Sequence, residues 1–294
     1  MIELTRRSKV ILVSVLSAVL LASIVFAGVL IDRTVQNAAS AVTQFQSAGG
    51  NWFSGSNWFQ GSVLARQTHT VALSLPKGAA FAFAAPIGTI NVVPATGHRV
   101  LVTVLVTAAG ETLAQARQRA SQMGLTQQSA GSSYSVAVNT PNGLALRGLE
   151  ATVEIPRGMV VTLTDHLGNV NVTGQFASLT MHANMGNCVA NVKVSGTTSI
   201  IDNLGNIVCS GTLGQMTTIS DHLGNIGVYL SPRHALGTTI TTNLGNVNMV
   251  GAIGKSFSRQ GNTWTGTIGA GAQMGTLNVS DNLGNVTLSE VNAS

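Results

Sequence analysis

The stretch that decides the fold is Asp165-His166-Leu167-Gly168-Asn169-Val170, because the chain repeats it several times. Degenerate copies surround Gly88-Thr89-Ile90 and Gly266-Thr267-Ile268. The steps from the glycine of one full copy to the next are 18, 19, 19, 21 and 39 residues, and the last step contains the second degenerate copy. A period of this length is typical of a chain that winds into stacked coils. The other full copies begin at Ala183, Asp202, Asp221, Thr242 and Asp281.

Apolar residues stand at fixed places around each repeated glycine. They are found five places and one place before it, and two and four places after it, while the residues between are mostly Thr, Ser, Asn, Asp or His. Each repeat therefore contains two alternating strands joined by a turn. One repeat cannot bury its own apolar residues, so we expect coils to stack at about 4.8 Å and cover one another. The predicted fold class is all-β, a single-stranded β-helix or β-solenoid with right-handed coils of 18 to 21 residues.

The Gly-Asn pair of each repeat has a structural role in this prediction. We expect the glycine to take a positive-φ corner and the asparagines to form a ladder of amide hydrogen bonds along the stack. Backbone turns account for both residue types, which favours structure over ligand binding here. The residues of the predicted turn and ladder are Gly168, Asn169, Gly186, Asn187, Gly205, Asn206, Gly224, Asn225, Gly245, Asn246, Gly284 and Asn285.

The composition agrees with an all-β protein and excludes one class of function. Only 9% of the residues are charged and 4% are aromatic, whereas the chain has 33 glycines and many β-branched residues. Such a composition favours short strands and tight turns over helices. The net charge is +5, but no run of Lys and Arg and no basic stripe with interleaved aromatic residues exists. A nucleic-acid partner is therefore not expected.

The N-terminal segment predicts export. Residues 1–9 contain Arg6, Arg7 and Lys9 and read as a cytoplasmic basic tail, and residues 10–31 are uncharged and long enough for a transmembrane helix. The alternative is a signal peptide cleaved before Gly28. We expect a single-pass cell-membrane protein with its C-terminal domain extracellular, or a protein secreted after signal cleavage. The membrane is thus one predicted partner.

The rest of the chain divides into a linker and one domain. Residues 32–66 are rich in Ser, Gly, Asn, Gln and Ala and predict a flexible linker, within which Asn51-Trp52-Phe53 is repeated as Asn57-Trp58-Phe59. Residues 67–294 form the predicted repeat domain. Glu111 to Met123 predicts one short inserted helix, with Leu113, Ala116, Ala120 and Met123 at helical spacing.

From about Thr68 to the C-terminus the chain resembles the bacterial putative-adhesin domain family of exported β-helix proteins, which is related to the heads of autotransporter-like adhesins. The resemblance rests on the strand Gly88-Thr89-Ile90-Asn91-Val92, the predicted helix, the strand end Val153-Glu154-Ile155-Pro156 and the Gly-Asn repeats. It implies exposure at the cell envelope and no known reaction.

The Asp-His pairs of the repeats are candidates for metal binding or acid-base chemistry. Counting coils puts His166 and His222 three rungs apart, about 14 Å, which is too far for one metal ion. Asp202 and Asp221 fall on adjacent rungs, but the glycine-rich Ca²⁺-binding nonapeptide pattern is absent. We expect Asp, Asn and His before the glycine to be residues of a solvated turn. No catalytic residue, metal site or cofactor is predicted.

The two cysteines, Cys188 and Cys209, occupy inward positions on neighbouring coils, offset by two residues. Their Cα atoms should then lie about 8 Å apart, beyond the reach of a disulfide, so we expect buried free thiols.

Three functions remain open on the sequence. The first is a non-catalytic, surface-displayed solenoid that acts as an adhesin or as an envelope scaffold or sensor, with a glycan or protein surface ligand. The second is a β-helix enzyme that acts on cell-wall or capsular polysaccharide. The third is self-association, because an uncapped end of the stack offers unpaired backbone groups.

Overall fold

The computed structural model describes residues 63–76, 78–140, 146–231, 235–251, 256–270 and 273–290. The predicted basic tail, transmembrane segment, both Trp-Phe pairs and nearly all of the linker lie outside these ranges. Within them, no helix is long and apolar enough to cross a membrane. The first strand begins at Val63, so the last residues of the predicted linker belong to the folded part.

The described chain is all-β with one helix, as predicted, and its strands form a single hydrogen-bonded sheet. The helix is α3 (Leu113–Gln122). The strands are β1 (Val63–Ser74), β2 (Ala80–Ala85), β3 (Gly88–Pro94), β4 (Arg99–Gly110), β5 (Gly124–Ala130), β6 (Ser133–Asn139), β7 (Leu146–Ile155), β8 (Met159–Val194), β9 (Thr197–Ile201), β10 (Leu204–Thr212), β11 (Met216–Leu230), β12 (Ala235–Leu244), β13 (Val247–Val250), β14 (Ser258–Gln260), β15 (Thr263–Ile268), β16 (Gln273–Leu283) and β17 (Val286–Glu290).

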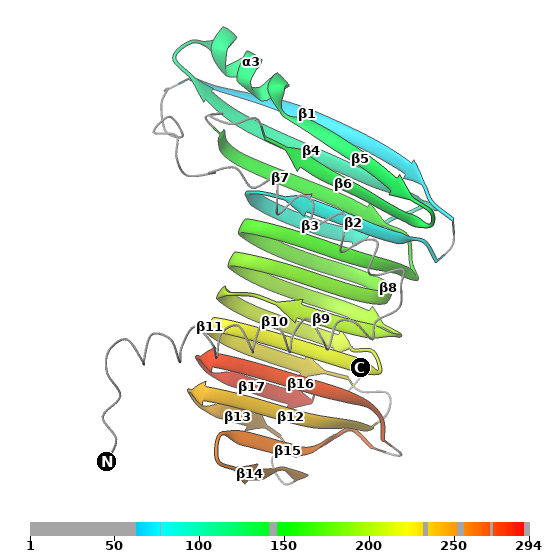
Figure 1. The fold of residues 1–294 in the computed structure, drawn as a ribbon, viewed down its shortest axis with the longest axis vertical. Helices are drawn as coiled ribbons and strands as arrows, with labels where there is room; N and C mark the ends of the chain where they lie inside the picture. Colours follow the sequence, from blue (N-terminus) through cyan, green and yellow to red (C-terminus); the bar gives the residue numbers. More distant parts are fainter. Residues whose placement is uncertain are drawn as a thin grey trace, which may run out of the picture.

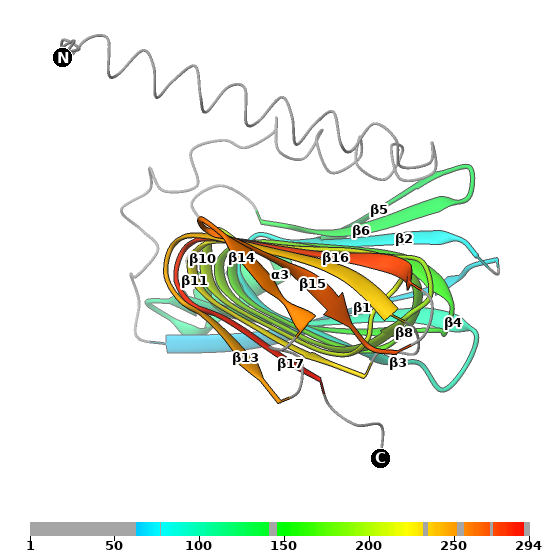
Figure 2. The same cartoon turned by 90° about the horizontal axis from the view of Figure 1, so that it is seen from below.

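Successive turns of the chain lie one above another in two walls (Figures 1 and 2). We call the part of each turn before the repeated glycine the first wall and the part after it the second wall. Pairing between the repeated turns is parallel in both walls and joins equivalent residues, for example Ile200 with Ile219 in the first wall and Gly205 with Gly224 at the start of the second. The repeat found in the sequence is therefore in register in three dimensions.

The core lies between the two walls. The residue five places before each glycine is at most 2% exposed, and a fully buried aliphatic side chain contributes about 1.5–3 kcal/mol. The residues two and four places after the glycine are also buried in most turns. In the repeat of Gly245, however, Val247 and Met249 are only partly buried. The first set comprises Leu163, Met181, Ile200, Ile219, Ile240 and Val279.

The order of the turns in space differs from their order in the sequence. We expected each turn to stack on the one before it, with the copy at Gly266 as a turn between the last two. Instead β16 and β17 lie between β11 on one side and β12 and β13 on the other. The copy around Gly266 belongs to β15, which runs antiparallel to β12 and pairs with β14. The hairpin β14–β15 thus covers the end of the first wall, and Arg259 stacks on the Trp264 ring at 4.6 Å.

The opposite end of the stack is built in the same way. The strands β2 and β3 lie between β8 and the later strands β6 and β7. Antiparallel strands then close both walls, since β7 pairs with β4, β4 with β1, and β6 with β5. The expectation of a plain uncapped end is wrong here, because antiparallel strands cover the parallel turns. At the other end, β13 pairs only with β17 among the described strands.

The helix α3 starts and ends close to the predicted limits. The N-cap Thr112 accepts a hydrogen bond from the Gln115 backbone N–H at 3.2 Å, and the Gln115 side chain accepts one from the Glu111 N–H at 2.7 Å. These bonds satisfy N–H groups that a helix start leaves free. Ala116 and Ala120 are buried as predicted, but Leu113, the first residue of the helix, is 44% exposed.

Candidate binding face

The repeated glycines stand where the chain turns from the first wall into the second. Gly168 and Gly186 have positive φ angles of 155° and 150°, but the other four are not among the described residues with positive φ. The predicted reason for glycine is therefore wrong for most of the repeats. The actual reason is close approach: a Cβ at Gly205 would overlap the carbonyl oxygen of Gly186 on the next rung. The same overlap would occur at Gly168, Gly186, Gly224, Gly245 and Gly284.

The asparagines that follow these glycines are joined into a ladder. Asn187 Nδ2 donates to Asn169 Oδ1 at 3.0 Å, and the backbone N–H of Asn187 donates to the same oxygen at 3.0 Å. Asn206 makes the same two bonds to Asn187. Each Oδ1 thus accepts two bonds, while each amide nitrogen keeps one N–H that the ladder does not use.

The ladder follows the order of the turns in space. After Asn225, the next amide is that of Asn285, whose Nδ2 donates to Asn225 Oδ1 at 3.2 Å. The Asn246 backbone N–H then donates to Asn285 Oδ1 at 3.1 Å. The amide ladder consists of Asn169, Asn187, Asn206, Asn225, Asn285 and Asn246.

A second polar column runs parallel to the amide ladder, two places before the glycines. Asn203 donates to Asn184 at 2.8 Å, and Asn243 donates to Asn282 at 2.7 Å. Asn282 also lies within hydrogen-bond distance of the His222 ring, 3.3 Å from Nδ1. The column consists of His166, Asn184, Asn203, His222, Asn282 and Asn243.

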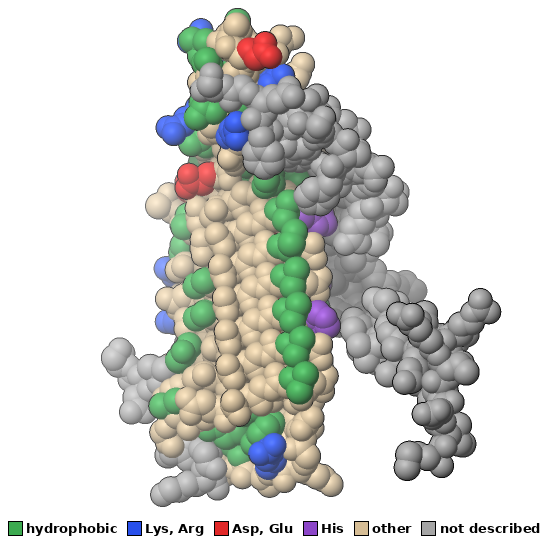
Figure 3. Space-filling view, turned by 90° about the vertical axis from the view of Figure 1, so that its left-hand side faces the viewer, with side chains coloured by type: hydrophobic (Ala, Val, Ile, Leu, Met, Phe, Trp, Pro, Cys, Tyr) green, Lys and Arg blue, Asp and Glu red, His purple; other side chains and the backbone are tan. Residues whose placement is uncertain are grey.

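An exposed apolar stripe separates the two polar columns. It is formed by the residue just before each glycine, which we had grouped with the buried apolar positions. That expectation is wrong: Leu204 is 41% exposed and Leu244 is 69% exposed. The alternation of the first wall stops at the corner, so two consecutive side chains face outward there. Figure 3 shows the stripe beside two histidines. Its members are Leu167 and Met185, which are partly exposed, and Leu204, Leu223, Leu283 and Leu244, which are exposed.

The aspartates three places before the glycine point into the core and are not residues of a solvated turn. Asp165 and Asp202 are each 1% exposed. Asp202 Oδ1 accepts the Asn203 backbone N–H at 2.8 Å, and Asp221 Oδ1 accepts the His222 N–H at 2.7 Å. The Oδ2 atoms of Asp202 and Asp221 have no hydrogen-bond partner among the described residues. The carboxyl group thus braces the turn from inside, at an inward position of the first wall.

Burial controls the protonation of these carboxyl groups. It raises the pKa of Asp165 to about 7, against the lowering effect of the N–H groups of His166 and Leu167. Burial, together with the neighbouring Asp202 and Asp281, raises the pKa of Asp221 to about 6, against the lowering effect of the His222 N–H. Asp281 pairs with Asp221 in register, so three aspartates occupy consecutive rungs. Because these four side chains are at most 4% exposed, a bulky substrate has no direct access to their carboxyl groups.

Metal-binding groups and the two cysteines complete the description of the predicted residues. The described part of the chain contains no group of three or more His, Cys, Asp or Glu residues that could hold a metal ion. Cys188 pairs with Ile207 and Cys209 with Ala190, so the cysteines keep the predicted offset of two residues. Both are buried free thiols, as predicted.

The comparisons with known proteins give only distant likenesses. No protein-family model matches the chain, and no curated protein matches it. A "putative cell adhesion protein" from Clostridium sporogenes is similar in structure, with a TM-score of 0.46 and 11% identity over 78% of this chain and 100% of that chain. A "putative adhesin" from Bacteroides fragilis has a TM-score of 0.34 and 8% identity over 76% of this chain and 97% of its own. Likenesses of this size carry no information on ligand or activity.

The amides lie at the corner that the repeat predicts, whereas the apolar stripe is a surface that the repeat pattern did not predict. The spacing of the inward residues indicates this surface. The inward aspartate and the next inward residue, for example Asp202 and Ile207, are five positions apart in the sequence. An odd gap cannot keep both residues on one side of a continuous strand, so the residues between must form a corner.

Proposed function

We propose that the chain is a surface-displayed, non-catalytic right-handed β-solenoid that binds an extended partner along its Gly-Asn corner, as an adhesin or as a scaffold or sensor of the cell envelope. The observation that carries the proposal is the exposed apolar stripe between two polar columns. Exposed apolar residues in a continuous patch mark interaction sites more often than scattered ones do.

The geometry of the corner suits a long ligand with its own repeat. The stripe offers one aliphatic side chain about every 4.8 Å, and each ladder amide keeps one free N–H beside it. A glycan chain, whose sugar rings have apolar faces and hydroxyl edges, matches this combination, as does an extended polypeptide. Because the register fixes every rung, such a face needs little ordering when it binds, which favours affinity.

The enzyme alternative is weaker on the same observations. It would rest on Asp202 and Asp221, the two acids on adjacent rungs, yet these are 1% and 4% exposed. A carboxyl group must reach the reacting bond to act as a general acid or base. Export, with the segment 10–31 as membrane anchor or cleaved signal peptide, is part of the proposal and rests on the sequence alone.

The test is a glycan and extracellular-matrix binding array with the purified full chain, read together with turnover of the same glycans. The variant Leu204→Thr/Leu223→Thr should lose about ten-fold or more in affinity for any partner found. Val189→Thr/Val208→Thr is the matched control, since these residues lie on neighbouring rungs and are 40% and 37% exposed, against 41% and 37% for the leucines. Equal losses in both variants, or turnover that Asp202→Ala/Asp221→Ala abolishes, would overturn the proposal.

A further inference from the structure

A groove lies at the corner opposite the glycines, where the chain returns from the second wall to the first. It has a volume of about 550 Å³. Its residues come from four successive turns and include neither Asp nor Glu. The lining residues are Arg157, Gly158, Gln175, Phe176, Lys193, Val194, Ser195, Thr212, Leu213 and Gln215. No residue of the groove belongs to the amide ladder, the polar column or the apolar stripe.

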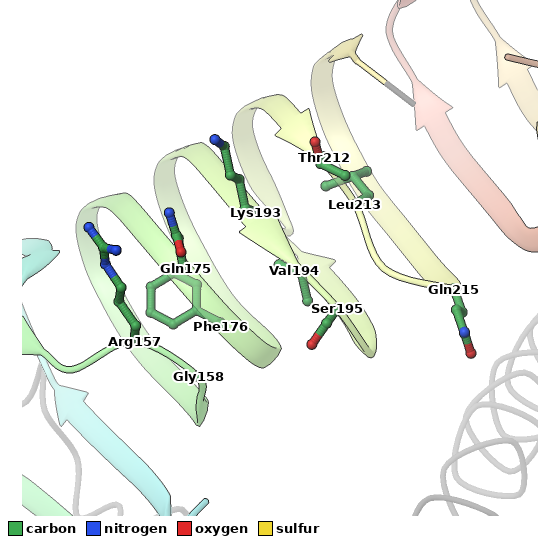
Figure 4. Close-up of a pocket in the computed structure, with 10 residues that line it drawn as sticks. All are labelled: Arg157, Gly158, Gln175, Phe176, Lys193, Val194, Ser195, Thr212, Leu213 and Gln215. Atoms are coloured by element: carbon green, nitrogen blue, oxygen red, sulfur yellow. The ribbon is translucent and has the colours of Figure 1, made fainter. Parts of the chain in front are cut away.

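Two cationic side chains stand in this groove at equivalent places of the repeat. Arg157, Gln175 and Lys193 form a row that points to one side of the turns (Figure 4). The Gly158 N–H donates to the Gln175 carbonyl at 2.9 Å, and Lys193 pairs with Thr212, which fixes the row in the stack. The row therefore reads cation, amide, cation, hydroxyl along the stack.

The charges of this row are uncompensated within the part of the chain that the structure describes. Arg157 and Lys193 are exposed, and neither forms an ion pair with a described carboxylate. Two rungs, about 10 Å, separate the backbones at Arg157 and Lys193. An extended ligand that carries several negative charges along its length matches this spacing, because it can engage each cation with a separate charge.

We propose that this groove binds an acidic polysaccharide, with carboxylates of separate sugar residues at Arg157 and Lys193. Gln175, Ser195, Thr212 and Gln215 offer amide and hydroxyl groups for the sugar hydroxyls between the charges. A guanidinium group can hold a carboxylate through two parallel hydrogen bonds, and the lysine ammonium acts as a point charge. The site does not depend on the corner face, so either site can fail without the other.

Binding of the full chain to polygalacturonate, with a neutral glycan of similar length as reference, tests the groove. Arg157→Gln/Lys193→Gln should weaken binding of polygalacturonate about ten-fold or more. The control Arg99→Gln/Arg117→Gln removes the same charge from exposed residues outside the groove and should leave affinity within about two-fold.

A second variant tests the spacing of the charges at constant net charge. Gln175→Lys/Lys193→Gln keeps two cations in the groove but places them on neighbouring rungs, and it should also weaken binding. Free galacturonate should compete poorly, because a single sugar brings one carboxylate and few hydroxyl groups to the groove. The proposal is overturned if the control pair weakens binding as much as the groove pair, if the neutral glycan or single-stranded DNA binds equally well, or if the shifted-charge variant binds as tightly as the natural chain.

Discussion

The amide of Asn285 donates to that of Asn225 across one rung, although 60 residues separate them in the sequence, while Asn246 lies on the far side of Asn285. The last repeat of the sequence is therefore wedged between two earlier ones. This arrangement distinguishes the fold from a solenoid that simply grows from its N-terminus to its C-terminus.

Engineered disulfides report the order of the turns. Ser280 Oγ lies 2.9 Å from Ser220 Oγ, so Ser220→Cys/Ser280→Cys should oxidise readily, because paired residues on adjacent strands satisfy the geometry of a disulfide. Thr241 pairs with Ser280 and not with Ser220, so Ser220→Cys/Thr241→Cys should stay reduced. Mass spectrometry of peptides cut without reductant measures both variants. Stacking in sequence order would give the reverse result.

The glycines of the corner should be intolerant of any side chain. Gly205→Ala places a methyl group against the carbonyl of Gly186, and the two rungs must separate to make room. We expect a loss of about 3–5 kcal/mol in the free energy of unfolding, measured by denaturant titration followed by circular dichroism. Gly97→Ala is the control, because a Cβ there meets no atom within 4 Å. If both substitutions are equally mild, close approach is not the reason for the glycine.

The buried aspartates predict that stability falls as pH rises. The pKa of Asp165 is raised from its ordinary 3.8 to about 7, so the folded chain binds more protons than the unfolded chain between these values. The contribution of Asp165 to the free energy of unfolding is then most favourable below about pH 4, and it is lost progressively up to about pH 7. For Asp165 alone the loss is on the order of 4 kcal/mol.

Thermal unfolding at pH 5 and pH 8 measures this effect, and the melting temperature should be higher at pH 5. In Asp165→Asn/Asp221→Asn the difference should shrink, because the amide stays neutral at both pH values and can still accept a backbone N–H. Glu290→Gln changes an exposed carboxylate and should leave the difference intact. An unchanged pH dependence in the double variant would show that the buried column is not its source.

The thiols of Cys188 and Cys209 should be inert in the folded chain. Burial raises the pKa of Cys209 to about 12 and raises that of Cys188 as well, and thiolates rather than thiols react with disulfide reagents. Titration with a chromogenic aromatic disulfide should detect no reaction in native buffer and both thiols in denaturant. Fast labelling of the native chain would contradict the burial of these residues.

Several features could be predicted from the sequence because they depend on the spacing of residues along the chain. The period placed Ile200 and Ile219 in one column and Cys188 and Cys209 two residues apart, and both relationships hold. The helix could be located because Thr112 is a favourable N-cap residue, Gly124 is a favourable stop, and few β-branched residues stand between them. The amides at the corner followed from the repeat itself.

Other features depend on contacts between turns and could not be read along the chain. Nothing in the sequence near Asp281 shows that its strand fits beside Asp221, since all repeats carry the same surface for their neighbours. The burial of the aspartates also contradicts the usual behaviour of carboxylates, which are rarely found in a core without a partner. The groove was missed because Arg157 precedes the first full repeat, so it was not aligned with Lys193.

The wedged position of β16 and β17 constrains how the chain reaches its final state during synthesis. Chains emerge from the ribosome N-terminus first, and most repeat proteins can add each new turn to those already formed. Here the place of β12 and β13 is not beside β11, because β16 and β17, which lie between them, are made later than β12 and β13. The turn of β12 and β13 can therefore reach its final place only after β16 and β17 have been made, and a nascent chain that has not yet reached Gln273 would keep this end of the stack open.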